Sequence, residues 1–103
     1  MSVDPQKLQE WAVPVIAGHK NGFEVPIEEV PDFLKKIDGG GPTSAFVSTW
    51  STANGRSLVI TWGDGFGHWG IVVGNKDFVM SGDNTFTHVS KWVQGVYFFN
   101  QTK

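Results

Sequence analysis

The sequence predicts an α+β domain in which two N-terminal helices pack on one face of a five- to six-stranded antiparallel β-meander. The chain has 103 residues, the length of a single domain over residues 1–103. Up to residue 38 its apolar residues follow helical spacing, and from residue 44 it is rich in β-branched and aromatic residues separated by glycine turns. Helices followed by consecutive strands are typical of helices packed on one side of an antiparallel sheet.

The first helix is expected at about residues 5–17. Asp4 precedes Pro5, and an acidic residue followed by proline is typical of a helix start. One apolar face follows at helical spacing, formed by Leu8, Trp11, Ala12 and Val15. Pro14 has no backbone N–H to donate, so we expect the helix to kink or end there. Trp11 is expected in the core because it lies on the apolar face.

The second helix is expected at about residues 28–38. Its apolar residues repeat the same spacing, at Val30, Phe33, Leu34 and Ile37. Pro31 suits a first helical turn, and acidic residues at the start with lysines at the end complement the helix dipole. The glycines at 39–41 end this helix and link it to the sheet.

The sheet is expected over about residues 44–100. Glycine-containing turns at Asn54–Gly55 and Gly74–Asn75 predict hairpins, because these residues tolerate positive φ. Alternation places Leu58, Ile60 and Trp62 on one face. The strands are expected near Ser44–Trp50, Ser57–Trp62, His68–Val73, Asp77–Met80, Thr85–Val89 and Trp92–Asn100.

Charge and composition exclude several function classes. The formal net charge is −2, and Arg56 is the only arginine, so the clustered cations that bind nucleic acid are missing. No stretch approaches the ~20 apolar residues that cross a bilayer, so no membrane partner is expected. The absence of cysteine excludes disulfides, thiolate nucleophiles and cysteine-ligated zinc. Since Met1–Glu10 lacks the apolar core of a signal peptide, we expect a cytoplasmic location.

The glycine-rich segment 63–70 is the most unusual in the chain. Gly65, Gly67 and Gly70 satisfy the dinucleotide glycine pattern, which has meaning only where a strand leads into a helix. Here the glycines lead into the apolar strand residues 71–73, so we reject a nucleotide site. No cofactor is expected.

The segment His68–Gly74, HWGIVVG, resembles the histidine strand of papain-like cell-wall peptidases. Those enzymes need a cysteine and this chain has none, so the resemblance implies no activity. Asp64 and His68 flank the glycine-rich loop, and a carboxylate beside an imidazole is the smallest unit of general-base chemistry. Turn chemistry alone also explains Asp64 followed by glycine. These two residues are the weak catalytic candidates.

A metal site would need several imidazole or carboxylate side chains to converge. The candidates are His19, His68, His88, Asp64 and Asp83. No pair has a metal-binding spacing such as i, i+4 on a helix, so no metal is expected.

The aromatic content has two interpretations: a self-contained aromatic core that clamps the strand ends, or a binding surface that includes some of these side chains. Aromatic residues make up 14% of the chain, including five tryptophans, four of them in the sheet region. Helices cover one face of a two-layer domain, so we expect the other face to be wet, paired with another chain or used for a ligand. The expected ligand-binding residues surround the glycine-rich loop, with at least one exposed tryptophan: Trp62, Phe66, His68 and Trp69.

The predicted function is therefore a non-catalytic binding or protein-interaction module. Its partner is an unknown protein or a small ligand such as a sugar ring or a peptide side chain. Two alternatives remain: a small hydrolytic or metal-assisted enzyme that uses Asp64 and His68, and a homo-oligomeric structural protein, most simply a homodimer.

Overall fold

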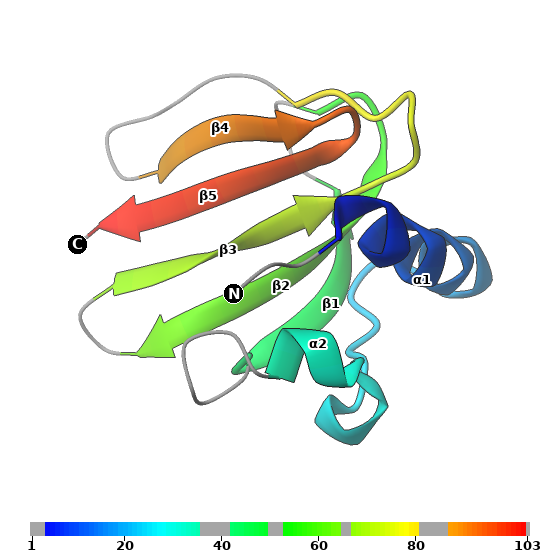
Figure 1. Ribbon diagram of the computed structural model, residues 1–103, viewed down its shortest axis with the longest axis horizontal. Helices are drawn as coiled ribbons and strands as arrows, with labels where there is room; N and C mark the ends of the chain where they lie inside the picture. Colours follow the sequence, from blue (N-terminus) through cyan, green and yellow to red (C-terminus); the bar gives the residue numbers. More distant parts are fainter. Residues whose placement is uncertain (1–3, 36–41, 50–52, 65–66, 81–86, 103) are drawn as a thin grey trace.

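A computed structural model describes residues 4–35, 42–49, 53–64, 67–80 and 87–102, with residues 64, 67, 68, 87, 101 and 102 described by their backbone alone (Figure 1). Five antiparallel strands, one long helix and two short helical turns confirm the α+β class. The elements are α1 (Pro5–Gly18), the 3-10 helix η1 (Ile27–Glu29), α2 (Asp32–Lys35), β1 (Ser44–Thr49), β2 (Arg56–Asp64), β3 (Gly67–Val73), β4 (Thr87–Val93) and β5 (Val96–Thr102).

Helix α1 begins where the capping pattern predicts. The Asp4 Oδ1 atom accepts a hydrogen bond from the Gln6 backbone N–H at 2.9 Å. The helix continues past Pro14 to Gly18, so it does not end at the proline. Its last turn is held by Arg56, whose guanidinium donates to the carbonyl oxygens of Ile16, at 2.6 Å, and His19. These bonds satisfy carbonyls that a helix end leaves without partners.

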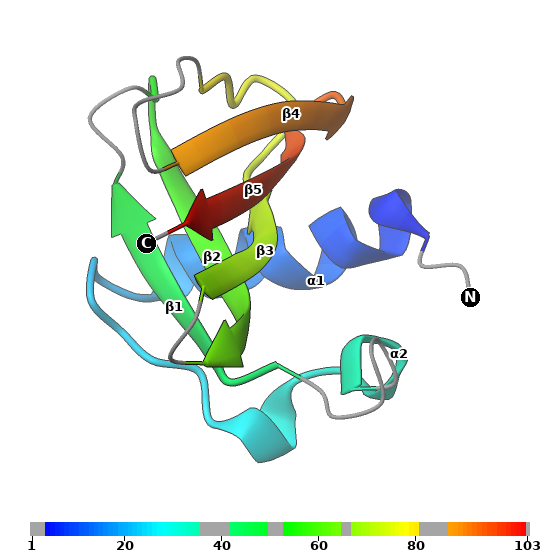
Figure 2. The same cartoon turned by 90° about the vertical axis from the view of Figure 1, so that its left-hand side faces the viewer.

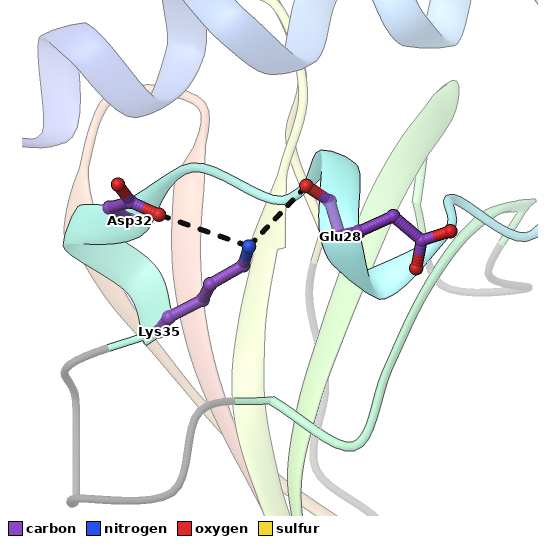
Figure 3. Close-up of polar contacts among 3 residues, drawn as sticks. All are labelled: Glu28, Asp32 and Lys35. Carbon is purple, nitrogen blue, oxygen red and sulfur yellow. Dashed lines mark hydrogen bonds and ion pairs between the residues drawn. The ribbon is translucent and has the colours of Figure 1, made fainter.

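The expected second helix at about 28–38 is wrong in its first half. Val30 is extended, with φ −70° and ψ 134°, because a residue that precedes a proline is disfavoured in the helical region. The segment therefore forms η1 and then a single turn, α2, which starts after Pro31. Lys35 Nζ joins the two pieces, 3.8 Å from Asp32 Oδ1 and 3.4 Å from the Glu28 carbonyl oxygen (Figure 3). Residues 36–38 of the expected helix lie outside the described residues.

The strand order is β1-β2-β3-β5-β4, so the expected simple meander is wrong. The chain crosses from β3 past β5 to reach β4, and β5 then returns between them. The expected strand at 77–80 is also wrong, because Met80 forms only an isolated bridge with Ala53. The last hairpin turns at Gln94–Gly95, later than expected, where Gly95 adopts a φ of 83°.

Helices α1 and α2 lie on the same side of the sheet, to the right of the strands in Figure 2. We call this side the helix-side face. Alternate residues of the strands pack there against the helices, and Leu8 and Leu34 are completely buried. The buried residues of this core are Leu8, Ala12, Val25, Val30, Leu34, Ala45, Val47, Leu58, Ile60, Trp62, Ile71, Val73 and Val96. Trp11 packs against them, partly buried.

The opposite face carries a second, smaller core. It is formed by Val59, Val72, Phe78, Met80, Tyr97 and Phe99. Phe78 and Met80 come from the connection between β3 and β4, and the Phe78 ring meets Tyr97 edge-on at 5.9 Å. The expectation that the whole of this face is left to solvent, another chain or a ligand is therefore wrong, since residues 74–80 fold back over part of it.

The outer edge of β1 is paired by the segment at 22–25. The Gly22 and Val25 amides donate to the carbonyls of Val47 and Ala45 at 2.7 and 2.8 Å, and the Val47 amide donates to Phe23 at 2.9 Å. This segment satisfies backbone groups that an edge strand would otherwise present. In the described ranges, no helix is both long and apolar enough to cross a membrane.

Candidate functional site

Four strands bring one row of side chains together on the helix-side face. Trp62 on β2 is opposite Trp69 on β3, Trp69 is opposite Asn100 on β5, and Asn100 is opposite His88 on β4. Directly opposite residues share a face of an antiparallel sheet, so the row crosses from β2 to β4 without a break. Trp69 packs against the helix-side core, which fixes the face on which the row lies.

Trp62 is the buried end of this row. Its side chain is 2% exposed, so the exposed tryptophan expected beside the glycine-rich loop is not Trp62. The physical reason is the alternation of β2, which places Trp62 on the same face as Leu58 and Ile60, under the helices. Its indole Nε1–H has no hydrogen-bond partner among the described residues. Because Trp62 is buried, it can influence a ligand only by holding the ring of Trp69.

Trp69 connects the buried and the exposed parts of the row. Its ring stacks on Trp62, with ring centroids 4.7 Å apart and an interplanar angle of 11°. The side chain is half-buried. One ring face is therefore taken by Trp62, and the stacking holds the Trp69 ring in a fixed orientation.

A hollow of about 400 Å³ lies at the exposed end of the row. We call it the β3–β5–β4 groove; it is lined by Trp69, His88, Val89, Ser90, Phe98, Phe99 and Asn100. Phe98 is 37% exposed and is opposite Ser90 across the β4–β5 pair. Its ring stacks on Trp92 at 4.8 Å and 22°, which holds the ring as Trp62 holds Trp69.

The groove lies at the end of the sheet that α1 does not reach. In Figure 1, α1 lies at the right-hand ends of the strands, whereas β3 and β4 begin, and β5 ends, on the left. Gln9 fastens α1 to the right-hand end, because its Nε2 donates to the carbonyls of Gly74 and Gln94, both at 3.0 Å. Trp69, His88 and Asn100 are near the other ends of their strands.

The groove combines aromatic surface with polar side chains. The described residues that line it include no Asp, Glu, Lys or Arg. Asn100, Ser90 and His88 are exposed, and between them they offer amide, hydroxyl and imidazole donors and acceptors. This composition suits a ligand with one apolar surface and one hydroxyl- or amide-bearing edge.

The catalytic candidates lie at the tip of the β2–β3 hairpin. Backbone pairing places Asp64 opposite Gly67 and His68 opposite Gly63, so the two residues are not cross-strand partners. Their side chains, and the whole of Phe66, lie outside the described part of the chain. Asp64 and His68 as catalytic residues, and Phe66 and His68 as ligand contacts, therefore stay predictions.

Sequence reasoning missed Phe98, Asn100 and the position of His88. A signal was present, because strict alternation from Val96 places Phe98 and Asn100 on one face. The identity of that face depends on β5 lying between β3 and β4, which no local pattern encodes.

The described residues include no group of three or more His, Asp or Glu side chains that could hold a metal ion. His19 is engaged elsewhere: its ring stacks on Phe23 at 3.7 Å and its Nδ1 hydrogen-bonds the Val15 carbonyl at 2.9 Å. Asp83 lies outside the described ranges.

No known protein family, curated protein or solved structure matches this chain.

Proposed function

We propose that this protein is a non-catalytic binding module that holds a small ligand in the β3–β5–β4 groove. The observation that carries the proposal is the half-open aromatic surface of Trp69 and Phe98 beside the polar side chains of His88, Ser90 and Asn100. Sites for small molecules are typically concave and aromatic, with a few polar groups that orient the ligand.

The size and the rigidity of the groove support this proposal. Its volume of about 400 Å³ falls within the range of roughly 300–1,000 Å³ that is usual for small-molecule sites. Trp69 and Phe98 are each held by a stacked neighbour, so little side-chain freedom is lost when a ligand binds. Phe98 is also among the few large apolar side chains, within the described residues, that remain more than a third exposed.

A screen of small-molecule fragments, monitored through the amide and indole NMR signals of the protein, tests the proposal. We expect fragments to shift the Trp69 indole signal and the amide signals of residues 88–90 and 98–100, while the Trp62 indole signal changes less. A matched control is Phe46→Leu, which alters a partly buried aromatic residue of the opposite face. Shifts confined to other surfaces, or no shifts at all, would contradict the proposal.

A soluble paramagnetic probe tests the geometry of the groove without any ligand. Trp69 is half-buried and Trp62 is 2% exposed, so we expect the Trp69 indole signal to broaden more strongly than that of Trp62. Light scattering over a range of protein concentrations should accompany this test. A homodimer that buries the groove would protect the indole signals of both Trp62 and Trp69. Equal protection of the two indoles in a proven monomer would remove the exposed aromatic surface on which the proposal rests.

A further inference from the structure

We propose that the ligand of the β3–β5–β4 groove is a neutral sugar ring, bound with its C–H face on Trp69 and Phe98 and its hydroxyls toward Asn100, His88 and Ser90. This inference rests on the proposed function and narrows it to one chemical class. It is supported by the arrangement of the rings, by the lack of Asp, Glu, Lys and Arg among the described residues that line the groove, and by the position of the polar groups.

Among the described residues, the rings of the groove form stacked pairs and not a cage. Trp69 lies nearly parallel to Trp62, at 11°, and Phe98 lies nearly parallel to Trp92, at 22°. Each stacked pair occupies one face of the Trp69 and Phe98 rings, and both residues line the groove. A flat partner such as the C–H face of a pyranose suits such a platform. A quaternary ammonium ion is instead held by several rings that surround it.

The residue types that line the groove favour a neutral ligand. The described residues around the groove include no Lys or Arg to pair with a phosphate or carboxylate, and no Asp or Glu to pair with an amine. A charged ligand would lose hydration there without gaining an opposite charge. Sugar hydroxyls are neutral and both donate and accept, as do the Asn100 amide and the Ser90 hydroxyl.

The polar groups lie where the edge of a stacked ring would reach them. Asn100 is one strand away from Trp69 and His88 is two strands away, a span of about 10 Å at the usual inter-strand spacing. Ser90 is on the same face of β4, opposite Phe98. A ring that lies on the aromatic platform therefore has polar side chains along the side toward β4.

Saturation-transfer NMR on the full chain tests this inference. The probes are methyl β-D-glucopyranoside, methyl β-D-galactopyranoside, methyl α-D-mannopyranoside and cellobiose, with choline, adenosine and phenyl phosphate as members of other classes. We expect at least one saccharide to receive saturation, strongest at the C–H protons of one ring face, and we expect choline and phenyl phosphate to receive none.

Two variants place the bound saccharide in the groove. Trp69→Leu removes the larger platform, and we expect it to weaken binding by about tenfold or more. Asn100→Ala changes an exposed side chain, so the fold is retained, and we expect binding about three- to tenfold weaker for the loss of a hydrogen bond. The control Phe46→Leu, on the opposite face, leaves the affinity unchanged. Wild-type affinity in Asn100→Ala and Trp69→Leu would overturn the assignment.

The outcomes separate this inference from the proposed function. If fragments bind the groove but none of the saccharides does, the ligand class is wrong and the binding module stands. Adenosine bound in place of saccharides leads to the same conclusion, since the groove would then select a flat base over a sugar ring. If neither fragments nor saccharides bind the groove, both proposals fall.

Discussion

The two ends of the helix-side face differ, although they belong to the same sheet and the same row of side chains. At the covered end, on β2, Trp62 is 2% exposed, and Leu58 and Ile60, which share its face of the strand, are completely buried. At the other end Phe98 is 37% exposed, and His88 and Asn100 are open to solvent. The aromatic stacking continues between the two ends through Trp69.

The two ends are expected to differ in how much their side chains contribute to the stability of the fold. Burial of apolar area is the main source of folding free energy, so stability is concentrated at the covered end. Side chains at the open end are expected to add little to stability, in agreement with the binding role that we propose for them. Substitutions at the two ends should therefore separate stability from binding.

The largest effect is expected at the covered end, from Leu58→Ala. Leu58 is completely buried on β2, so the change removes apolar burial and leaves a cavity. We expect the free energy of unfolding to fall by about 2–5 kcal/mol, measured by urea denaturation. Val79→Ala serves as control because Val79 is 54% exposed. A loss of unfolding free energy smaller than that of Val79→Ala would mean that the residues around Leu58 are not the core.

An intermediate effect is expected from Gly95→Ala, where α1 is fastened to the sheet. Gly95 has a φ of 83°, and an added Cβ would meet the Asn75 carbonyl oxygen and Gln9 Nε2. We expect a loss of about 2 kcal/mol from the positive φ and the crowding together. Gly55→Ala is the matched control, since a Cβ there meets nothing within 4 Å. Equal stability of the two variants, measured by thermal unfolding, would contradict the described turn.

The smallest effect on stability is expected at the open end, from His88→Ala. His88 is exposed on β4, so we expect the free energy of unfolding to change by no more than about 0.5 kcal/mol. Binding of any ligand found in the groove should nevertheless weaken, as measured by titration calorimetry. A large loss of stability without a change in affinity would reverse the roles that we assign to the two ends.

Local chemistry explains which parts of the fold could be predicted from the sequence. The Asp4–Pro5 start of α1 and the alternation of β2 follow from capping and side-chain period, and both occur as expected. The segment at 77–80 shows where a local pattern misleads. Phe78 and Met80 alternate as in a strand and are buried, but Asn75 holds the chain in a turn by accepting from the Asp77 and Phe78 amides, both at 3.0 Å.

The groove could not be predicted because it depends on long-range strand order. Trp69, Asn100 and His88 become neighbours only when β5 lies between β3 and β4. β3 and β4 are separated by a connection whose path cannot be recognised from a local sequence pattern. The sequence therefore identified Trp69 as a candidate but not the polar side chains beside it.

The position of β5 also has a consequence for the order in which the chain folds during synthesis. β1, β2 and β3 are consecutive neighbours, so they can pair as they leave the ribosome. β4 emerges next, but its neighbour in the sheet is β5, which is synthesised after it. Until β5 has been synthesised, β3 and β4 each present an unpaired edge. β5 then pairs with both strands. The strand that follows β4 in the chain therefore completes the described sheet and, with it, the groove.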